Sequence, residues 1–389
     1  MISFENTEIA FKSKSEFQLK KAYWLFKIIS SPTLVKLGKI ITPIALNLRF
    51  PIKKIIKSTI FSQFCGGESI KECSSTIDTL ARYRIGTILD YSVEGQESLE
   101  GVENTVREII GTIERGSNDT NIPFAVFKVS GIATFSLLEK VSSNIILSED
   151  EQKEFLQIEA RVNRICQSAF DCNLPIFIDA EESWIQKAID DIALKMMLVY
   201  NKKRAIVYNT LQMYRWDRMT YLKFCLDEAK KYGIIYGVKL VRGAYMEKER
   251  LRAEKLGCKS PIHASKEDCD KDFDTALEFI CEYHESFALC AGTHNETSSL
   301  FLTQLMKNKG ISCSDERFYF AQLLGMSDHI SFNLSNSSFN VAKYVPYGPV
   351  KEVLPYLLRR ADENTSVAGQ TGRELSLIQK EKMRRKLFK

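Results

Sequence analysis

Residues 341–364 read VAKYVPYGPVKEVLPYLLRRADEN, and here a strand pattern runs directly into a helix pattern. At 3.6 residues per turn the helix has an apolar stripe made of Val350, Val353, Leu354, Leu357, Leu358 and Ala361. Another face carries Tyr356, Arg359, Arg360 and Glu363 at helical spacing. Two guanidinium groups beside a phenol suit a small carboxylate, because a planar guanidinium binds a carboxylate through two parallel hydrogen bonds. A solvated face with an Arg359/Glu363 ion pair is the alternative.

Similar strand patterns, rich in β-branched and aromatic residues, occur earlier in the chain and are separated by amphipathic helix patterns. The eight predicted strands are 86–91, 124–130, 175–180, 205–210, 236–242, 287–293, 318–323 and 341–347. Strands that alternate with helices are typical of parallel sheets, and eight such units predict an α/β fold of the (β/α)8 TIM-barrel type. We expect a basic helical N-terminal arm at 1–80, the barrel at 81–370 and a basic helical tail at 371–389.

Polar residues stand near the ends of these predicted strands, where (β/α)8 barrels carry their active sites. In chain order they are Lys128, Asp179, Gln212, Lys239, Arg242, Thr293, His294, Gln322 and Tyr344. Any one of them could be an ordinary rim residue, but burying so many polar groups without partners would cost free energy. The set therefore predicts an active site at this face. Its several cations favour an anionic substrate or a phosphorylated cofactor, and Gly243 and Ala244 would allow a bulky ligand to approach the backbone.

Composition excludes several classes of site. The ten cysteines form no CxxC pair, so we expect free thiols in a reducing compartment. None of the four histidines has metal-binding spacing, and we expect no metal site. The chain contains neither GxGxxG nor a P-loop, so the usual dinucleotide and nucleotide motifs are missing.

The N-terminal region is strongly basic, with eleven Lys and Arg against three Glu in residues 1–60. Apolar residues lie among these lysines, in runs too short to span a bilayer. Contact with anionic lipid is one interpretation, and a helical arm packed on the main domain is the other. We expect no nucleic-acid binding, because no recognised motif is present. Glu5, Glu8 and Glu16 argue against a signal peptide.

These motifs together resemble the proline dehydrogenase family, flavoenzymes that oxidise L-proline to Δ1-pyrroline-5-carboxylate. The resemblance covers about residues 80–370. It is carried by Tyr356-Leu357-Leu358-Arg359-Arg360 with Glu363-Asn364, Val-Arg-Gly-Ala-Tyr at 241–245, Ile178-Asp179-Ala180-Glu181, Thr293-His294-Asn295 and Tyr347-Gly348-Pro349.

The resemblance implies FAD as cofactor and a role for each matched residue. Arg359 and Arg360 would bind the proline carboxylate with help from Lys128, while Glu363 would orient these cations. Tyr344 and Tyr356 would pack around the ring. The residues implied to bind FAD are Asp179, Gln212, Lys239, Arg242, Gly243, Ala244, Thr293 and His294. The implied catalytic residues are Asp179, Lys239 and Tyr344.

We expect a monofunctional enzyme that performs the first step of proline catabolism and passes electrons to a membrane quinone. The expected location is the cytoplasm, peripheral on the inner face of a bacterial membrane, or the mitochondrial inner membrane in a eukaryote. The alternatives are a hydroxyproline dehydrogenase, a folate-linked flavin reductase, and a non-catalytic barrel that binds lipid or protein. The bulky phenol of Tyr344 favours proline, because it should crowd a 4-hydroxyl group.

Overall fold

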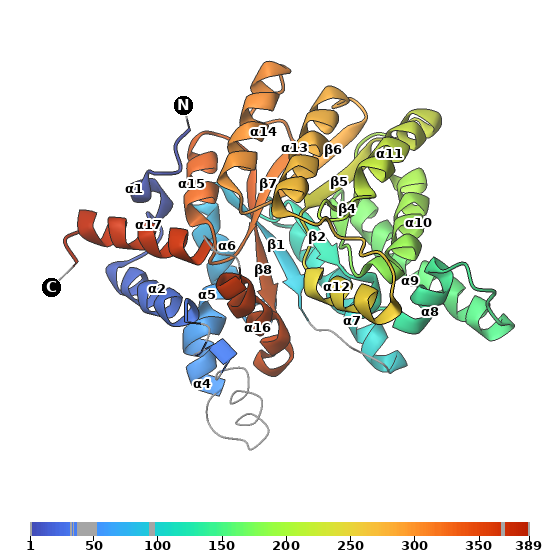
Figure 1. Ribbon diagram of the computed structural model, residues 1–389, viewed down its shortest axis with the longest axis horizontal. Coiled ribbons are helices and arrows are strands. Elements are labelled where there is room, and N and C mark those ends of the chain that lie inside the picture. Colours follow the sequence, from blue (N-terminus) through green and yellow to red (C-terminus); the bar gives the residue numbers. More distant parts are fainter. Residues whose placement is uncertain are drawn as a thin grey trace. The chain divides into compact units, whose positions relative to one another are not determined.

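Eight parallel strands, in chain order, form a closed barrel with helices between them (Figure 1). This computed structural model describes residues 2–31, 33, 35–36, 53–92, 98–366 and 370–387, with side chains left out at 361–366 and 370–371. The strands are β1 Ile85–Tyr91, β2 Phe124–Phe127, β3 Ile176–Ile178, β4 Val207–Gln212, β5 Tyr236–Val241, β6 Phe287–Gly292, β7 Phe318–Leu323 and β8 Val341–Tyr347. The predicted (β/α)8 fold is therefore confirmed.

The helices have clear sequence reasons for where they begin and end. Ser15 and Ser148 cap α2 and α9 in capping boxes with Gln18 and Glu151, and Gly233 (φ +60°) ends α11 in the left-handed region. The helices of unmixed α type are α1 Thr7–Ala10, α2 Glu16–Ile29, α4 Lys53–Ile56, α5 Ser62–Phe64, α6 Ser74–Ala81, α7 Leu99–Ser117, α8 Phe135–Ser142, α9 Glu149–Asp171, α10 Ser183–Tyr200, α11 Arg218–Tyr232, α12 Met246–Leu256, α13 Lys266–Glu282, α14 Glu296–Asn308, α15 Asp328–Asn336, α16 Val350–Ser366 and α17 Gln370–Arg384. The segment η1 Lys57–Phe61 is a π-helix and η2 Val129–Gly131 is a 3₁₀ turn.

The chain divides into two compact units, Met1–Val93 with Gln322–Lys389, and Glu94–Ala321. In the first unit β1 pairs with β8 along its full length. Its core joins α2, through Leu19 and Phe26, to α16, through Val353 and Leu357. The buried face of α2 thus agrees with the packed interpretation of the N-terminal arm. The predicted division into arm, barrel and tail stays a prediction.

The second unit has an aromatic core built from residues at the first or second position of its strands. Phe124 of β2 stacks on Phe177 of β3 with ring centroids 4.3 Å apart, and Tyr319 of β7 meets Phe124 edge-on at 4.8 Å. Tyr208 of β4 packs edge-on against both phenylalanines. These rings fill the barrel interior near the strand starts, so polar side chains gather toward the strand ends.

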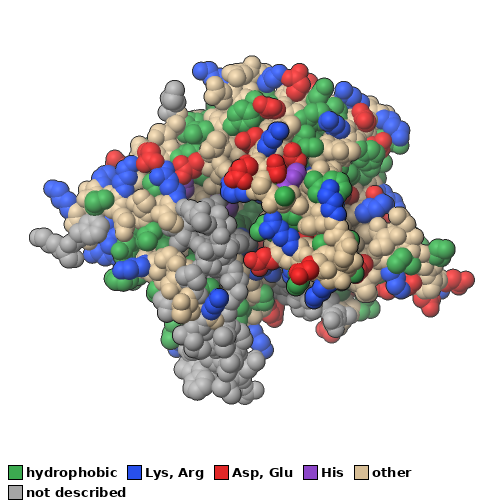
Figure 2. Space-filling view, in the orientation of Figure 1, with side chains coloured by type: hydrophobic (Ala, Val, Ile, Leu, Met, Phe, Trp, Pro, Cys, Tyr) green, Lys and Arg blue, Asp and Glu red, His purple; other side chains and the backbone are tan. Residues whose placement is uncertain are grey.

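The surface carries mixed charge on the visible face. In Figure 2, Lys and Arg side chains are interspersed with Asp and Glu instead of forming one cationic field. Among the described residues, no helix is both long and apolar enough to cross a membrane.

Candidate active site

Asp179 and Lys239, two predicted site residues, form a buried ion pair in the second unit. Lys239 lies in β5 opposite Thr210 of β4, and Asp179 comes directly after β3. Their side chains are only 6% and 14% exposed, and the ammonium lies 5.4 Å from the centroid of the Phe177 ring. Buried charges of this kind require a partner of opposite sign, so the pair fixes both side chains at the strand ends.

Arg242, just after β5, is held on every side of its guanidinium group. Its Nε donates to Asp270 at 2.6 Å, one terminal nitrogen to Thr293 at 2.7 Å, and the other to Ser298 at 2.9 Å. The guanidinium carbon lies 4.3 Å from the centroid of the Phe273 ring. The structure thus joins the predicted residues Arg242 and Thr293, while sequence reasoning missed Asp270 and Ser298.

Asp270 stays ionised because of its two cationic partners. Burial acts to raise the pKa of Asp270, but hydrogen bonds from Lys266 and Arg242 outweigh it and hold that pKa below its usual value. Arg242 is therefore a fixed cation after β5 that shares the Asp270 carboxylate with Lys266.

Two predicted cofactor residues near Arg242 have features that suit a bound ligand. Gln212, the last residue of β4, buries its Oε1 without a hydrogen-bond partner among the described residues. Such an orphaned acceptor is costly unless a ligand or water supplies a donor. Gly243 has φ +137°, and a Cβ there would lie 2.5 Å from the Tyr214 ring. Only glycine fits at that position.

Lys128, predicted to contact substrate, lies between β2 and the 3₁₀ turn η2. The predicted strand 124–130 ends three residues too late, because β2 ends at Phe127. Ser130 instead lies in the turn η2, where it donates hydrogen bonds to Glu181. The Ser130 N–H donates to Glu181 Oε1 at 2.9 Å, and the Ser130 hydroxyl donates to Oε2. Burial raises the pKa of Glu181 to about 7, although the Ser130 hydrogen bonds and the charge of Lys128 oppose the rise.

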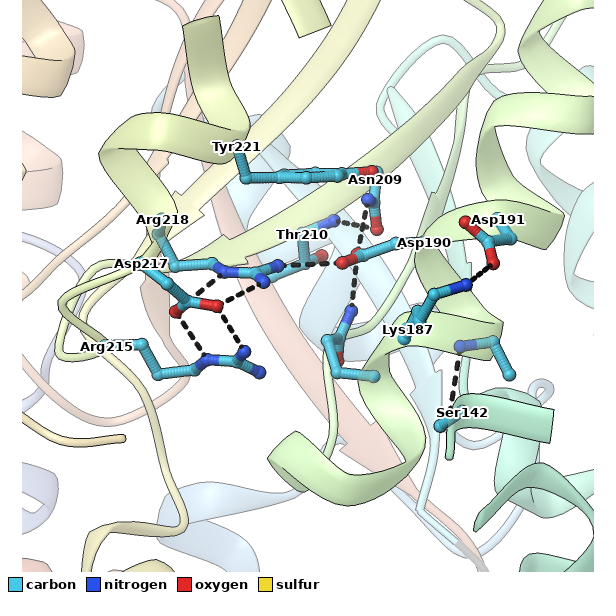
Figure 3. A network of polar contacts seen from close by, with 12 residues as sticks. Ser142, Lys187, Asp190, Asp191, Asn209, Thr210, Arg215, Asp217, Arg218 and Tyr221 are labelled. Carbon is cyan, nitrogen blue, oxygen red and sulfur yellow. Dashed lines mark hydrogen bonds and ion pairs between the residues drawn. The ribbon is translucent and has the colours of Figure 1, made fainter. Parts of the chain in front are cut away.

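A buried polar network supports this end of the second unit (Figure 3). Asp190 of α10 accepts from Asn209 of β4 at 2.9 Å and from Arg218 at 2.7 Å. Arg215 and Arg218 both donate to Asp217, at 2.6 and 2.8 Å. Each charge is balanced within the network, which ties α10, β4 and the start of α11 together. In the sequence, the only sign of this network is that its charged residues lie shortly before and after β4.

The residues predicted to bind substrate in the first unit lie on β8 and α16. Tyr344, Tyr356 and Arg360 are buried, and Arg359 is half-buried. The guanidinium carbon of Arg360 lies 5.1 Å from the centroid of the Tyr356 ring. The alternative of a solvated face is therefore wrong for Tyr356 and Arg360. The side chains of Glu363 and Asn364 lie outside the described part.

The residue before Tyr344 on β8 carries a buried charge. Lys343, also on β8, pairs with Asp328 at 3.0 Å and donates to the carbonyl oxygens of Leu323 and Met326. Burial lowers the pKa of Lys343, against the opposing charge of Asp328. Sequence reasoning treated Lys343 only as part of a strand pattern.

Two further predicted cofactor residues, Ala244 and His294, lie in connections between strands and helices. Ala244 is exposed in the connection after β5, and His294 is half-buried immediately before the Asn295 cap of α14. Within the described ranges, no group of three or more His, Cys, Asp or Glu side chains is arranged to hold a metal ion.

Comparison with known proteins identifies the family. A family profile described as proline dehydrogenase matches residues 73–373. Proline dehydrogenase 1, mitochondrial, of Dictyostelium discoideum is 34% identical, over 88% of this chain and 68% of the relative. Carbapenem antibiotics biosynthesis protein CarD of Pectobacterium carotovorum subsp. carotovorum is 33% identical, over 84% and 85%. Hydroxyproline dehydrogenase of Xenopus laevis is 28% identical, over 97% and 89%.

A solved structure shares the fold. Proline utilization A (PutA) from Bdellovibrio bacteriovorus, inactivated by N-propargylglycine, matches with a TM-score of 0.72 at 17% identity. The match covers 92% of this chain but only 38% of the PutA chain, so this chain spans well under half of that protein. The family profile and the relatives confirm the resemblance found in the motifs: the chain belongs to the proline dehydrogenase family and is an oxidoreductase of that family.

Proposed function

We propose that this protein oxidises L-proline to Δ1-pyrroline-5-carboxylate with FAD as the hydride acceptor. The observation that carries the proposal is the Arg359–Arg360 pair beside Tyr356 on α16, inside the matched family region. Tyr356 and Arg360 are buried, so this face of α16 is shielded from water, which strengthens charge-assisted hydrogen bonds. A guanidinium in such a place can bind a substrate carboxylate through two parallel hydrogen bonds.

The residues predicted to hold FAD suit its chemistry. The buried Gln212 Oε1 can accept a hydrogen bond from an N–H of the isoalloxazine ring. Arg242, fixed by Asp270, Thr293 and Ser298, offers positive charge for a phosphate. When bound, FAD would take up the hydride from the ring carbon next to nitrogen.

The protein's own contribution is to bind and orient the substrate. In this proposal Arg359 and Arg360 bind the substrate carboxylate, and the rings of Tyr344 and Tyr356 pack against the pyrrolidine. Lys128 is proposed separately, from the family resemblance, as a further ligand of the carboxylate. Holding the carboxylate fixes which ring carbon can react, and that gain is mainly one of orientation. The Asp179–Lys239 pair would present a hydrogen-bond donor to the cofactor at the end of β5.

The test is whether purified protein, reconstituted with FAD, loses its flavin absorbance when L-proline is added without oxygen. Arg359→Met should raise KM for L-proline at least tenfold, because a bidentate charged contact contributes about 1.5–3 kcal/mol, and it should retain FAD. Lys351→Met is the matched control, since Lys351 is exposed at the start of the same helix. Protein that binds no FAD would overturn the proposal in favour of a non-catalytic barrel. Loss of flavin in Arg359→Met would assign that arginine to the cofactor.

Hydroxyproline oxidation is the second candidate, because one relative is named a hydroxyproline dehydrogenase. Tyr344 is buried on β8, and its phenol leaves less room for a 4-hydroxyl group. We therefore propose that L-proline is preferred. The ratio of kcat/KM for L-proline to that for 4-hydroxy-L-proline tests this, and Tyr344→Ala should reduce the ratio. A ratio below one in the wild type would reverse the assignment.

We also propose that α2 contacts an anionic membrane, where a quinone could accept the electrons. Phe17, Trp24 and Ile28 are 76%, 58% and 51% exposed on the face of α2 opposite its buried residues. Lys27 lies 5.0 Å from the Trp24 ring, so apolar and cationic groups share this face. Aromatic and basic residues on one helix are typical of interfacial binding. The membrane would be the bacterial cytoplasmic membrane, or the mitochondrial inner membrane in a eukaryote.

Removing residues 1–60 would also remove part of the core, so surface substitutions are the better test. Phe17→Ser with Trp24→Ser should reduce co-sedimentation with vesicles that contain anionic lipid. Ile146→Ser is the control, because Ile146 is 93% exposed elsewhere on the chain. Equal co-sedimentation of both proteins would show that α2 does not bind the vesicles. Reduction of a soluble quinone by L-proline tests the acceptor.

A further inference from the structure

The segment after β3, Asp179-Ala180-Glu181-Glu182, carries three carboxylates that contact three different elements. Asp179 pairs with Lys239 of β5, and Glu182 pairs with Lys248 of α12 at 2.9 Å. Glu181 alone turns toward the connection after β2. The roles proposed above include Asp179 but leave the buried Glu181 without one.

Glu181 caps the 3₁₀ turn that follows Lys128. The turn η2 has no side-chain cap of its own, and the N–H groups at the start of such a turn lack partners within it. Glu181 supplies both oxygens to Ser130, one to the N–H at 2.9 Å and one to the hydroxyl. A negative charge at this position also suits the positive end of the turn. The carboxylate therefore holds the backbone immediately after Lys128.

Glu181 is itself held rigidly. Its backbone N–H donates to Gln186 Oε1 at 2.8 Å, and Gln186 Nε2 donates to Asp190 at 2.8 Å. Asp190 belongs to the buried network of Figure 3, which includes Asn209 and Arg218. Because every link is buried and hydrogen-bonded, the Glu181 carboxylate has little freedom to follow a moving turn.

We propose that Glu181 is a positioning residue for substrate binding, which fixes the backbone next to Lys128 by capping the turn through Ser130. The inference rests on the proposed function, in which Lys128 binds the substrate carboxylate. Both Glu181 oxygens accept hydrogen bonds from Ser130, so in this proposal Glu181 acts on the turn next to Lys128 and is not itself a substrate ligand. The charge of Lys128 lowers the pKa of Glu181 against the effect of burial, which agrees with two groups close together.

The kinetic test is a double-mutant cycle between Glu181→Gln and Lys128→Met. Glu181→Gln keeps the shape of the side chain but removes its charge. It should raise KM for L-proline about tenfold, the equivalent of one charge-assisted hydrogen bond, with kcat within about twofold and FAD content unchanged. The effect should vanish in the Lys128→Met background. Glu182→Gln is the matched control, because Glu182 is a neighbouring buried carboxyl that pairs with Lys248, and its KM should stay near that of the wild type.

Ser130→Ala gives the same information if Glu181→Gln does not fold. It removes the hydroxyl but keeps the N–H, so a smaller rise in KM of about threefold should appear and should also vanish with Lys128→Met. A rise that persists in the Lys128→Met background, or an equal rise in Glu182→Gln, would overturn the proposal and leave Glu181 as a stability residue.

A second measurement does not depend on activity. Trace labelling with an amine reagent at pH 8 should modify Lys128 several-fold faster in Glu181→Gln than in the wild type, because the nearby carboxylate that favours the charged ammonium is gone. The exposed Lys153 provides the reference rate. Unchanged labelling of Lys128 would overturn the positioning role. If wild-type protein does not oxidise L-proline, the proposed function fails, while this labelling still decides whether Glu181 fixes Lys128.

Discussion

Removing the ammonium of Lys239 should destabilise the protein far more than removing a surface lysine. Lys239 and Asp179 are 6% and 14% exposed, so Lys239→Met leaves the Asp179 carboxylate buried without this counter-charge. Breaking such a pair typically costs about 3–5 kcal/mol, and we expect about 3 kcal/mol here because Asp179 keeps some access to solvent. Replacing both members, with Asp179→Asn added, should cost only about 1 kcal/mol.

The assay is urea unfolding at pH 7.5, followed by far-UV circular dichroism, for the two single variants and the double variant. The difference between the double variant and the sum of the singles should be about 2 kcal/mol or more. Lys187→Met is the matched control. Lys187 pairs with Asp191 at 2.7 Å, but both side chains are more than half exposed, so its loss should cost less than about 0.5 kcal/mol.

The reasoning would be refuted by additive single variants, or by a Lys239→Met variant as stable as Lys187→Met. Either result would mean that the Asp179–Lys239 pair is solvated in solution. FAD content, measured on the same samples, separates stability from cofactor binding. If Lys239 contacts the flavin, the double variant should fold yet bind FAD more weakly than the wild type.

Three further predictions concern other parts of the chain. Gly243→Ala should destabilise the protein by about 2–4 kcal/mol, because its Cβ would lie 2.5 Å from Tyr214 at a positive φ; a thermal midpoint equal to the wild type would contradict this. Glu181 has a folded-state pKa of about 7 against a usual 4.5, so the native state binds more protons between these values. Stability should therefore fall as pH rises from 4.5 to 7, by up to ~3 kcal/mol from this group, and urea titrations of Glu181→Gln should lack that part of the slope. Burial raises the pKa of the Cys166 and Cys225 thiols, so a thiol reagent should label the exposed Cys258 in the native protein and those two only after unfolding; labelling of all three at similar rates would be inconsistent with the packed helices.

The strands could be predicted because their sequence pattern is local. The predicted bounds of 318–323 and 341–347 coincide with β7 and β8, since apolar runs bounded by turn residues report a buried parallel strand directly. The strand at 124–130 ended too late, because Ser130 turns away to meet a carboxylate that lies 51 residues further along the chain. No local pattern carries that information.

Candidate site residues could be located from the sequence, but their partners could not. Asp179 and Lys239 stood out as polar residues at strand ends, and the barrel brings them together. In the sequence, Asp270 lies among other charged residues of α13 and resembles an ordinary surface residue. In the structure its Oδ1 accepts a hydrogen bond from Arg242 Nε at 2.6 Å. Lys343 shows the same limit, because its burial is possible only where Asp328 and two carbonyl groups meet it. Partnership of this kind depends on tertiary contacts that periodicity does not encode.

The pairing of β1 with β8 has a consequence for the order of events during synthesis. The first compact unit combines residues 1–93 with residues 322–389, whereas the second is continuous in the chain. On the ribosome, β1 and α2 emerge early but cannot meet β8 or α16 until more than two hundred further residues have been made. The apolar face of α2 can meanwhile pack on Phe61 and Phe64, but it lacks its native contacts with Val353 and Leu357 of α16. The helix that carries Arg359 and Arg360 is synthesised after all eight strands, so catalytic competence should appear only once the strands have been made.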